Sequence, residues 1–176
     1  MAEIALVLSN TRPQPAGGSY EHLFPEKSPR WLFARLLAPS GQALQAGVAK
    51  DADALALTAT PLGPRVGAGV RGPVALWVVL TNPVAGKEAE YNAWYDGRHL
   101  DDSLAIPGFV AGRRYKVTDT VGPESARWAY LALYEIELDR AAEALAEAAA
   151  RAGGPKMPNP GYLAPGTAAL PFRPMA

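Results

Sequence analysis

The chain has 176 residues, 49% of them hydrophobic, which suits one compact domain with a sizeable core. Its 17 Lys and Arg balance 17 Asp and Glu, so it lacks the basic excess expected of a nucleic-acid binder. Cysteine is absent, which excludes disulfides, thiol catalysis, iron–sulfur clusters and cysteine-based zinc sites.

The first half of the chain predicts strands separated by loops. Apolar runs of strand length occupy residues 3–9, 31–38 and 54–60. The run 31–38 is also compatible with a helix, although we favour a strand. Pro25 within residues 20–28 and Pro29 directly after them allow this stretch a helical turn or two at most. The Gly- and Pro-rich stretch 62–73 predicts a linker or a wide turn.

The second half predicts the order β-α-β-β-α-β. Its elements are expected at residues 74–81, 86–104, 109–118, 128–138, 140–151 and near 167–172, with Asp139 as N-cap of the second helix. In the first helix, α-helical spacing places Tyr91, Tyr95, His99 and Asp102 on one face. Gly97 costs about 1 kcal/mol relative to Ala, so this helix is expected to bend or fray there.

The first helix and the strand after it carry a motif that resembles a known family. It consists of Tyr91, Trp94, Tyr95, Asp96, His99 and Leu100, then Ile-Pro-Gly-Phe at 106–109 and Arg114-Tyr115. These residues resemble the helix-1 signature of EthD-like proteins of the dimeric α/β-barrel superfamily, over residues 74–152. The resemblance implies an α+β, ferredoxin-like unit that pairs its sheet with a second unit into a barrel, with the ligand pocket between sheet and helices. Since that superfamily hosts isomerases, cyclases, decarboxylases and monooxygenases, it implies a fold more than a reaction.

The first half also aligns with the second. His22 aligns with His99 and Trp31 with Phe109, at similar intervals. We therefore predict one domain, 1–176, built as a tandem pseudo-dimer. A degenerate lobe, 1–62, with a shortened first helix and without its second helix and fourth strand, would precede a complete lobe, 74–176. The alternative is that short apolar segments align by chance.

His99 is the strongest candidate for chemistry, because an imidazole titrates near neutral pH. Tyr95 would donate to a developing oxyanion, and Asp102 would orient the His99 ring. The alternative for His99 is a structural role at a helix end, bonded to a backbone carbonyl.

Six further residues are candidate ligand contacts: Tyr91, Trp94, Arg113, Arg114, His22 and Trp31. The aromatic pair on the helix also suits plain packing against a sheet. The two arginines must point to opposite faces of their strand, so one of them is expected to face the pocket. His22 and Trp31 enter through the internal alignment.

Neither a metal nor a nucleotide cofactor is expected. The two histidines lack metal-ligand spacing, and no Walker motif is present. The glycines at 67, 69 and 72 precede a strand, which is the wrong context for a dinucleotide fingerprint. No apolar run of membrane-spanning length exists, and an acidic residue follows Met1-Ala2, so we expect a cytoplasmic protein without a membrane partner.

These observations favour an enzyme. We predict a cofactor-independent acid–base reaction of the lyase, cyclase or isomerase type on a small apolar, aromatic or polyketide-like carbonyl compound bound in the barrel. The protein would act as a homodimer or as an intrachain pseudo-dimer. Two alternatives stay open: a cofactor-free monooxygenase on the same fold, and a non-catalytic small-molecule binding or assembly protein.

Overall fold

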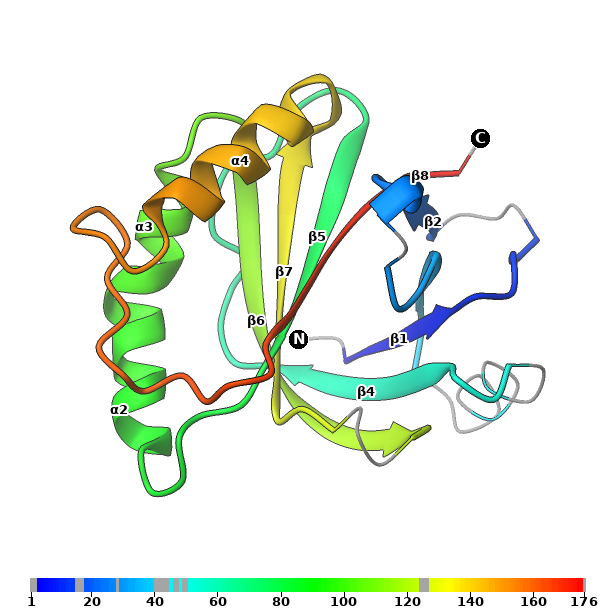
Figure 1. The fold of residues 1–176 in the computed structure, drawn as a ribbon, viewed down its shortest axis with the longest axis horizontal. Coiled ribbons are helices and arrows are strands. Elements are labelled where there is room, and N and C mark those ends of the chain that lie inside the picture. The colour runs from blue at the N-terminus through cyan, green and yellow to red at the C-terminus, as the bar shows by residue number, and fades with distance from the viewer. Residues whose placement is uncertain are drawn as a thin grey trace.

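Eight antiparallel strands close into a barrel in an α+β fold (Figure 1). The computed structural model describes residues 3–14, 18–27, 29–39, 45, 48, 51–123 and 127–175. Around the barrel the strands run β1-β3-β2-β8-β5-β7-β6-β4. Their bounds are β1 Ile4–Ser9, β2 Ser19–His22, β3 Phe33–Leu37, β4 Leu55–Pro61, β5 Val74–Thr81, β6 Phe109–Val121, β7 Tyr130–Glu137 and β8 Ala168–Pro174.

The helices with described bounds lie together on one side of the barrel (Figure 1). The first runs from α2 (Glu88–Trp94) through the π-helical turn η2 (Tyr95–His99) into α3 (Leu100–Leu104). The second is α4 (Ala141–Arg151), entered through the 3-10 turn η4 (Leu138–Arg140); another such turn, η1, spans Pro25–Lys27. From β5 onward the chain therefore has the predicted order β-α-β-β-α-β. Within the described residues, no helix is long and apolar enough to cross a bilayer.

The two larger apolar cores lie inside the barrel and between the barrel wall and the helices, and Ala5, Val7 and Ala56 form a small third one. β5 shows how the sequence supplies both. Leu76, Val78 and Leu80 face the interior, whereas Ala75 and Val79 face the helices. Successive residues of a strand point to opposite sides, so a strand covered on both faces is apolar throughout.

The two halves of the chain order their strands in the same way. The first half reads β4-β1-β3-β2 and the second reads β8-β5-β7-β6, which is fourth, first, third, second in both. The halves join where β2 pairs with β8 and where β4 pairs with β6. Among the described strands, each one therefore has a neighbour on both sides.

Several predictions for individual segments are wrong. His22 ends strand β2, which pairs with β3 and β8, whereas His99 is helical, so the alignment of these two histidines fails. The first half keeps a fourth strand, β4, because Leu55–Pro61 finds partners in both β1 and β6. Asp139 lies within η4, and α4 begins without a side-chain cap. At Gly97 the helix widens into the π turn and continues.

Candidate functional site

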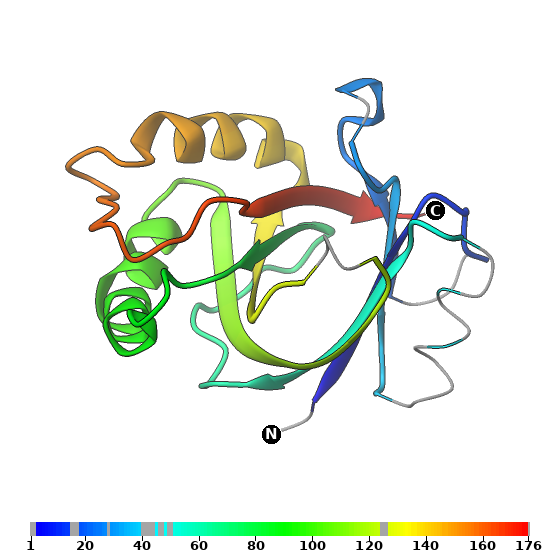
Figure 2. The same ribbon diagram turned by 60° about the horizontal axis from the view of Figure 1, so that its bottom comes forward.

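A cavity of about 240 Å³ lies between the barrel wall and the helices. Its lining comes from β5 (Trp77, Val79, Thr81), the first helix (Trp94, Tyr95, His99), α4 and its end (Leu145, Ala148, Ala149, Ala152) and the segment leading into β8 (Met157, Leu163, Thr167, Ala169). Figure 2 shows this last segment passing from α4 along the first helix before it enters the sheet. The alanines of α4 leave space that larger side chains would fill. Exposed residues such as Ala149 and Thr167 mark the open side of the cavity.

The π-helical turn sets the geometry of two cavity residues. In a regular α-helix, residues five positions apart point about 140° away from each other. The wider turn brings Trp94 and His99 to the same side, where their rings stack at 4.4 Å between centroids with an interplanar angle of 29°. Tyr95 meets the His99 ring edge-on at 4.7 Å. Turns of this kind occur frequently at functional sites.

Both stacked rings carry a buried nitrogen without a hydrogen-bond partner. Trp94 Nε1 and His99 Nδ1 find no donor or acceptor in the described part of the chain. An unsatisfied buried polar group costs about 1–3 kcal/mol, so each such group calls for an explanation. Both residues line the cavity, but the two nitrogens are buried in its wall, so a ligand pairs with them only when the rings turn toward it.

His99 is uncharged at neutral pH. Burial lowers the pKa of His99 to about 4; the Asp102 carboxylate opposes this shift, and the positive charge of Arg114 adds to it. The neutral ring carries one lone pair that can accept a proton or a hydrogen bond.

The structure does not join Asp102 to His99 as predicted. The Asp102 carboxylate instead accepts a hydrogen bond from Arg98 Nε at 3.1 Å, four residues earlier in the helix. Residues at this spacing are neighbours on a helix surface, which favours the Arg98 pairing. The His99 ring is therefore positioned by its stacking on Trp94. The His99 backbone carbonyl accepts a further bond from the Ser103 hydroxyl at 2.8 Å.

Tyr95 lines the cavity, but its hydroxyl already has a partner. It shares a hydrogen bond of 3.1 Å with the Tyr134 hydroxyl. Burial raises the pKa of Tyr95 well above its usual value, so the phenol stays protonated at neutral pH. Tyr91 is engaged as well, since its hydroxyl lies 2.7 Å from Thr81 Oγ1. Of these aromatic residues, Trp94 is the one whose donor lacks an acceptor.

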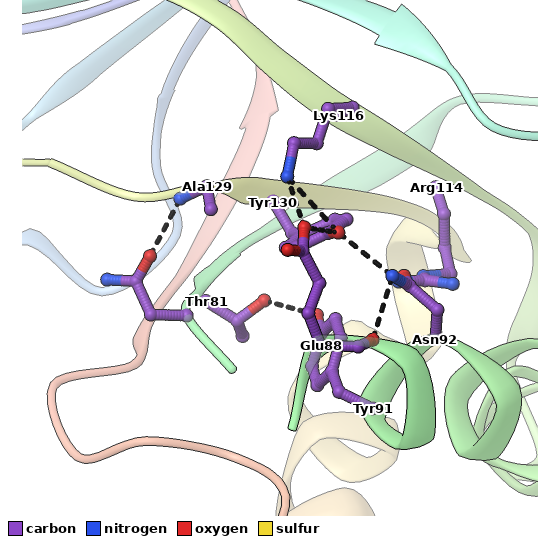
Figure 3. Close-up of polar contacts among 9 residues, drawn as sticks. Thr81, Glu88, Tyr91, Asn92, Arg114, Lys116, Ala129 and Tyr130 are labelled. Carbon is purple, nitrogen blue, oxygen red and sulfur yellow. Dashed lines mark hydrogen bonds and ion pairs between the residues drawn. The ribbon is translucent and has the colours of Figure 1, made fainter. Parts of the chain in front are cut away.

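Arg114 is buried beneath the first helix and ties it to β6 (Figure 3). Its Nη1 lies 2.5 Å from the Asp96 carboxylate, and its Nη2 donates to Asn92 Oδ1 at 2.7 Å. The guanidinium carbon lies 4.2 Å from the centroid of the Tyr95 ring, a cation–π distance. Of the two arginines on β6, Arg114 therefore faces the helix side, directly behind a cavity residue.

A second set of polar contacts continues this network (Figure 3). The Tyr130 hydroxyl donates to Glu88 Oε1 at 2.5 Å and accepts from Asn92 Nδ2 at 2.9 Å and Lys116 Nζ at 3.2 Å. Lys116 also pairs directly with Glu88 at 2.5 Å. Ion pairs and hydrogen bonds to β6 and β7 thus fix the first helix, which carries the stacked rings of Trp94 and His99.

Three predicted ligand contacts lie away from the cavity. Arg113 faces the opposite side of β6 from Arg114, at the barrel interior. His22 Nδ1 accepts a hydrogen bond from the backbone N–H of Phe24 at 3.0 Å. Trp31 is fully buried in the barrel core, where its Nε1 donates to the backbone carbonyl of Asp53 at 2.7 Å. The internal alignment therefore placed His22 and Trp31 wrongly.

Sequence reasoning missed most of the lining. Trp77 stands alone among aliphatic residues on its strand, and that contrast was an available signal. The alanines of α4 have high helix propensity, which explains them without any role in a cavity. Met157 and Leu163 lie in an irregular segment, where no periodicity marks them. Among the described residues, no group of three or more His, Asp or Glu side chains is arranged to hold a metal ion.

Solved structures with this fold include the following two. An anthrone oxidase-like protein is similar with a TM-score of 0.58 and 11% identity, over 99% of this chain and 91% of that one. A major regulator of staphylococcal pathogenesis is similar with a TM-score of 0.58 and 9% identity, over 99% of each chain. No family model and no curated protein sequence matches the chain. At such low identity the two similarities show the fold alone.

Proposed function

We propose that the cavity binds a small aromatic carbonyl compound and that the protein moves a proton at the carbon beside the carbonyl group. The observation that carries this proposal is the pair of partnerless nitrogens, Trp94 Nε1 and His99 Nδ1, on stacked rings that line the cavity. The Trp94 N–H donates to the carbonyl oxygen, which becomes negative as the proton leaves. Neutral His99, with its own proton on Nε2, accepts the substrate proton at Nδ1. Isomerases, cyclases and many lyases share this step.

The cavity favours a flat and small ligand. Its volume of about 240 Å³ is below the range of about 300–1,000 Å³ typical of sites for drug-sized molecules. Trp77, Trp94 and Tyr95 supply aromatic walls, and the remaining lining is largely aliphatic. A ligand of one or two fused rings matches this space, and larger polyketides do not.

Arg114 supports the same step from behind the wall. Its guanidinium lies against the Tyr95 ring and is held in place by two oxygen acceptors. Because the Asp96 carboxylate offsets the charge of the guanidinium, the contribution of Arg114 is to hold the Tyr95 ring and the first helix in place. We assign Arg114 a positioning role.

Deuterium exchange into 2-tetralone, a two-ring ketone, tests the proposal. In D₂O the wild-type protein should accelerate exchange of the protons beside the carbonyl, followed by proton NMR. His99→Gln should lower the accelerated rate by about 10²–10⁴-fold. His22→Gln is the matched control, since it removes the other imidazole of the chain, which lies away from the cavity. The rate should rise with pH through about 4, as free His99 loses its proton, and then level off.

Equal exchange rates in the wild type and the folded His99→Gln variant would remove His99 as the base. Bound 2-tetralone without accelerated exchange would instead support the non-catalytic binding protein. Trp94→Phe separates binding from chemistry, because it keeps a smaller aromatic ring beside His99 and removes the N–H donor together with part of the indole.

A cofactor-free oxygenase is the second candidate. The observation that favours it is the shared fold with an anthrone oxidase-like protein. The same carbanion would then pass electrons to dioxygen instead of being reprotonated. Uptake of dioxygen that depends on a carbonyl substrate and on His99 would identify this route.

We also propose that the barrel is a ferredoxin-like tandem pseudo-dimer, with lobes at 1–62 and 74–176. The identical strand order of the two halves supports this, as does the motif that resembles EthD-like proteins. A barrel closed within one chain has no need of a second copy to cover a sheet edge. Sedimentation should therefore report a monomer of 18.6 kDa, and a stable dimer would contradict this arrangement.

A further inference from the structure

We infer that helix α4 decides which ligands enter the cavity: Ala148 limits their size to two fused rings, and Ala149 controls their passage. Both residues line the cavity, Ala148 with a buried side chain and Ala149 with an exposed one. The inference rests on the proposed function for the class of ligand, a flat and uncharged ring compound. It does not rest on the proton transfer at His99, so the two can fail separately.

One face of α4 turns toward the cavity, and small side chains occupy most of it. Four lining residues recur at i, i+3, i+4 and i+7 along the helix and its end, namely Leu145, Ala148, Ala149 and Ala152. This spacing is that of a helix face directed at a core. Leu145 is the one large side chain among the four, so the three alanines are where the helix leaves room.

Close packing explains a small residue at Ala144 but does not explain one at Ala148. A Cβ added at Gly108 would lie 3.2 Å from the Ala144 Cβ, so α4 already lies against the turn before β6 at that point. Ala148 comes one turn later, is 2% exposed, and lines the cavity together with Trp77 and Val79. A larger side chain at Ala148 would therefore take up cavity volume.

The volume of the cavity sets the number of rings. An apolar cavity of about 150 Å³ is enough to bind benzene. The cavity beneath the helices measures about 240 Å³, which leaves room for a second fused ring. Replacing Ala148 with Leu adds three carbon atoms to the wall and brings the cavity back toward the size for a single ring.

The lining also restricts the charge of the ligand. Among the described residues that line the cavity, none is an Asp, Glu, Lys or Arg. An ionic ligand would lose its hydration there without gaining a partner of opposite charge. Neutral ring compounds are therefore the class among which the size of the cavity discriminates.

The cavity opens between α4 and the start of β8. Ala149 on the helix side and Thr167 and Ala169 on the strand side are exposed lining residues. Ala169 lies opposite Val79 in the pairing of β5 with β8, so both residues point to the helix side of the sheet. A ligand that passes between helix and strand meets Ala149 before it reaches Ala148. A longer side chain at Ala149 should narrow this passage.

Leucine-methyl NMR with indole and benzene as probes tests the inference. Neither probe is a carbonyl compound, so the result does not depend on proton transfer. Both should shift the methyl resonances of Leu145 and Leu163. Ala148→Leu should weaken indole binding about 10- to 100-fold through overpacking, and keep the benzene affinity within about threefold. Ala148→Val adds two carbon atoms and should give a smaller loss in the same direction.

Two further variants of α4 complete the test. Ala149→Leu should slow association and dissociation of indole by similar factors and keep its Kd within about twofold, as measured from methyl line shapes. Ala146→Leu, at an exposed position outside the lining, is the matched control and should change neither affinities nor rates.

Three results would overturn the inference. One is an unchanged ratio of indole to benzene affinity in the folded Ala148→Leu or Ala148→Val variant. The second is the absence of binding of either probe to the wild type, and the third is wild-type rates in Ala149→Leu. Failure of the proposed proton transfer has a different signature, because 2-tetralone would then bind without accelerated exchange.

Discussion

Acidification should destabilise this protein through His99. The pKa of a histidine in an unfolded chain is about 6.5, whereas burial lowers that of His99 to about 4 in the folded protein. Between pH 4 and pH 6.5 the unfolded state therefore binds more protons than the folded state. The contribution of the uncharged His99 ring to the free energy of unfolding is complete above about pH 6.5 and is lost as the pH falls toward 4. From these two pKa values, the free energy of unfolding should fall by about 2 kcal/mol between pH 7 and pH 5.

Urea unfolding at pH 7 and pH 5 measures this loss. Wild type and His99→Gln should differ by about 2 kcal/mol in how much stability they lose, because the variant lacks the titrating ring. The pKa of His22 is also lowered by burial, but that histidine is present in both proteins and cancels in the comparison. With two histidines in the chain, NMR can follow each imidazole separately. A His99 titration near pH 6.5, or equal losses in both proteins, would refute the burial of this ring.

Four further substitutions test how the site and the linker before β5 are supported. Arg114→Met should cost about 2–3 kcal/mol in urea unfolding, below the usual figure for a broken buried pair because the partner carboxylate is exposed. Tyr130→Phe should cost about 1–2 kcal/mol, since the hydroxyl has three polar partners. Gly67→Ala should cost about 2 kcal/mol or more, because its φ is +96° and an added Cβ would lie 2.3 Å from the Val110 carbonyl oxygen. Gly63→Ala, where the added Cβ meets open space, should stay within about 0.5 kcal/mol. Equal free energies of unfolding in Gly67→Ala and Gly63→Ala would contradict this account of the linker.

The second half of the chain could be predicted well because its local signals agree. The run at 74–81 is apolar on both faces, and a strand covered on both sides needs that composition. The alanine-rich run before Gly153 has strong helix propensity, and Ala141–Arg151 is indeed helical. Of the candidate residues in the motif, Trp94, Tyr95 and His99 line the cavity, whereas Tyr91 and Asp102, expected on the same face as His99, do not.

The π turn and strand β2 could not be predicted from local pattern. A π turn changes which residues share a helix face, so Trp94 rather than Asp102 becomes the partner of His99. Periodicity at about 100° per residue cannot register that change. Ser19–His22 is short and half polar, and it is a strand because it completes the barrel between β3 and β8. Tertiary pairing decided its structure.

The indole N–H resonances test the central claim most directly. The chain has four tryptophans, and Trp94→Phe identifies the resonance of the one without an acceptor. Saturating 2-tetralone should move this resonance downfield, as expected when an N–H gains a carbonyl acceptor. The resonances of Trp31 and Trp128, which already donate to backbone carbonyls at 2.7 Å and 2.9 Å, should stay in place. An unmoved Trp94 resonance in the saturated protein would contradict the proposed site.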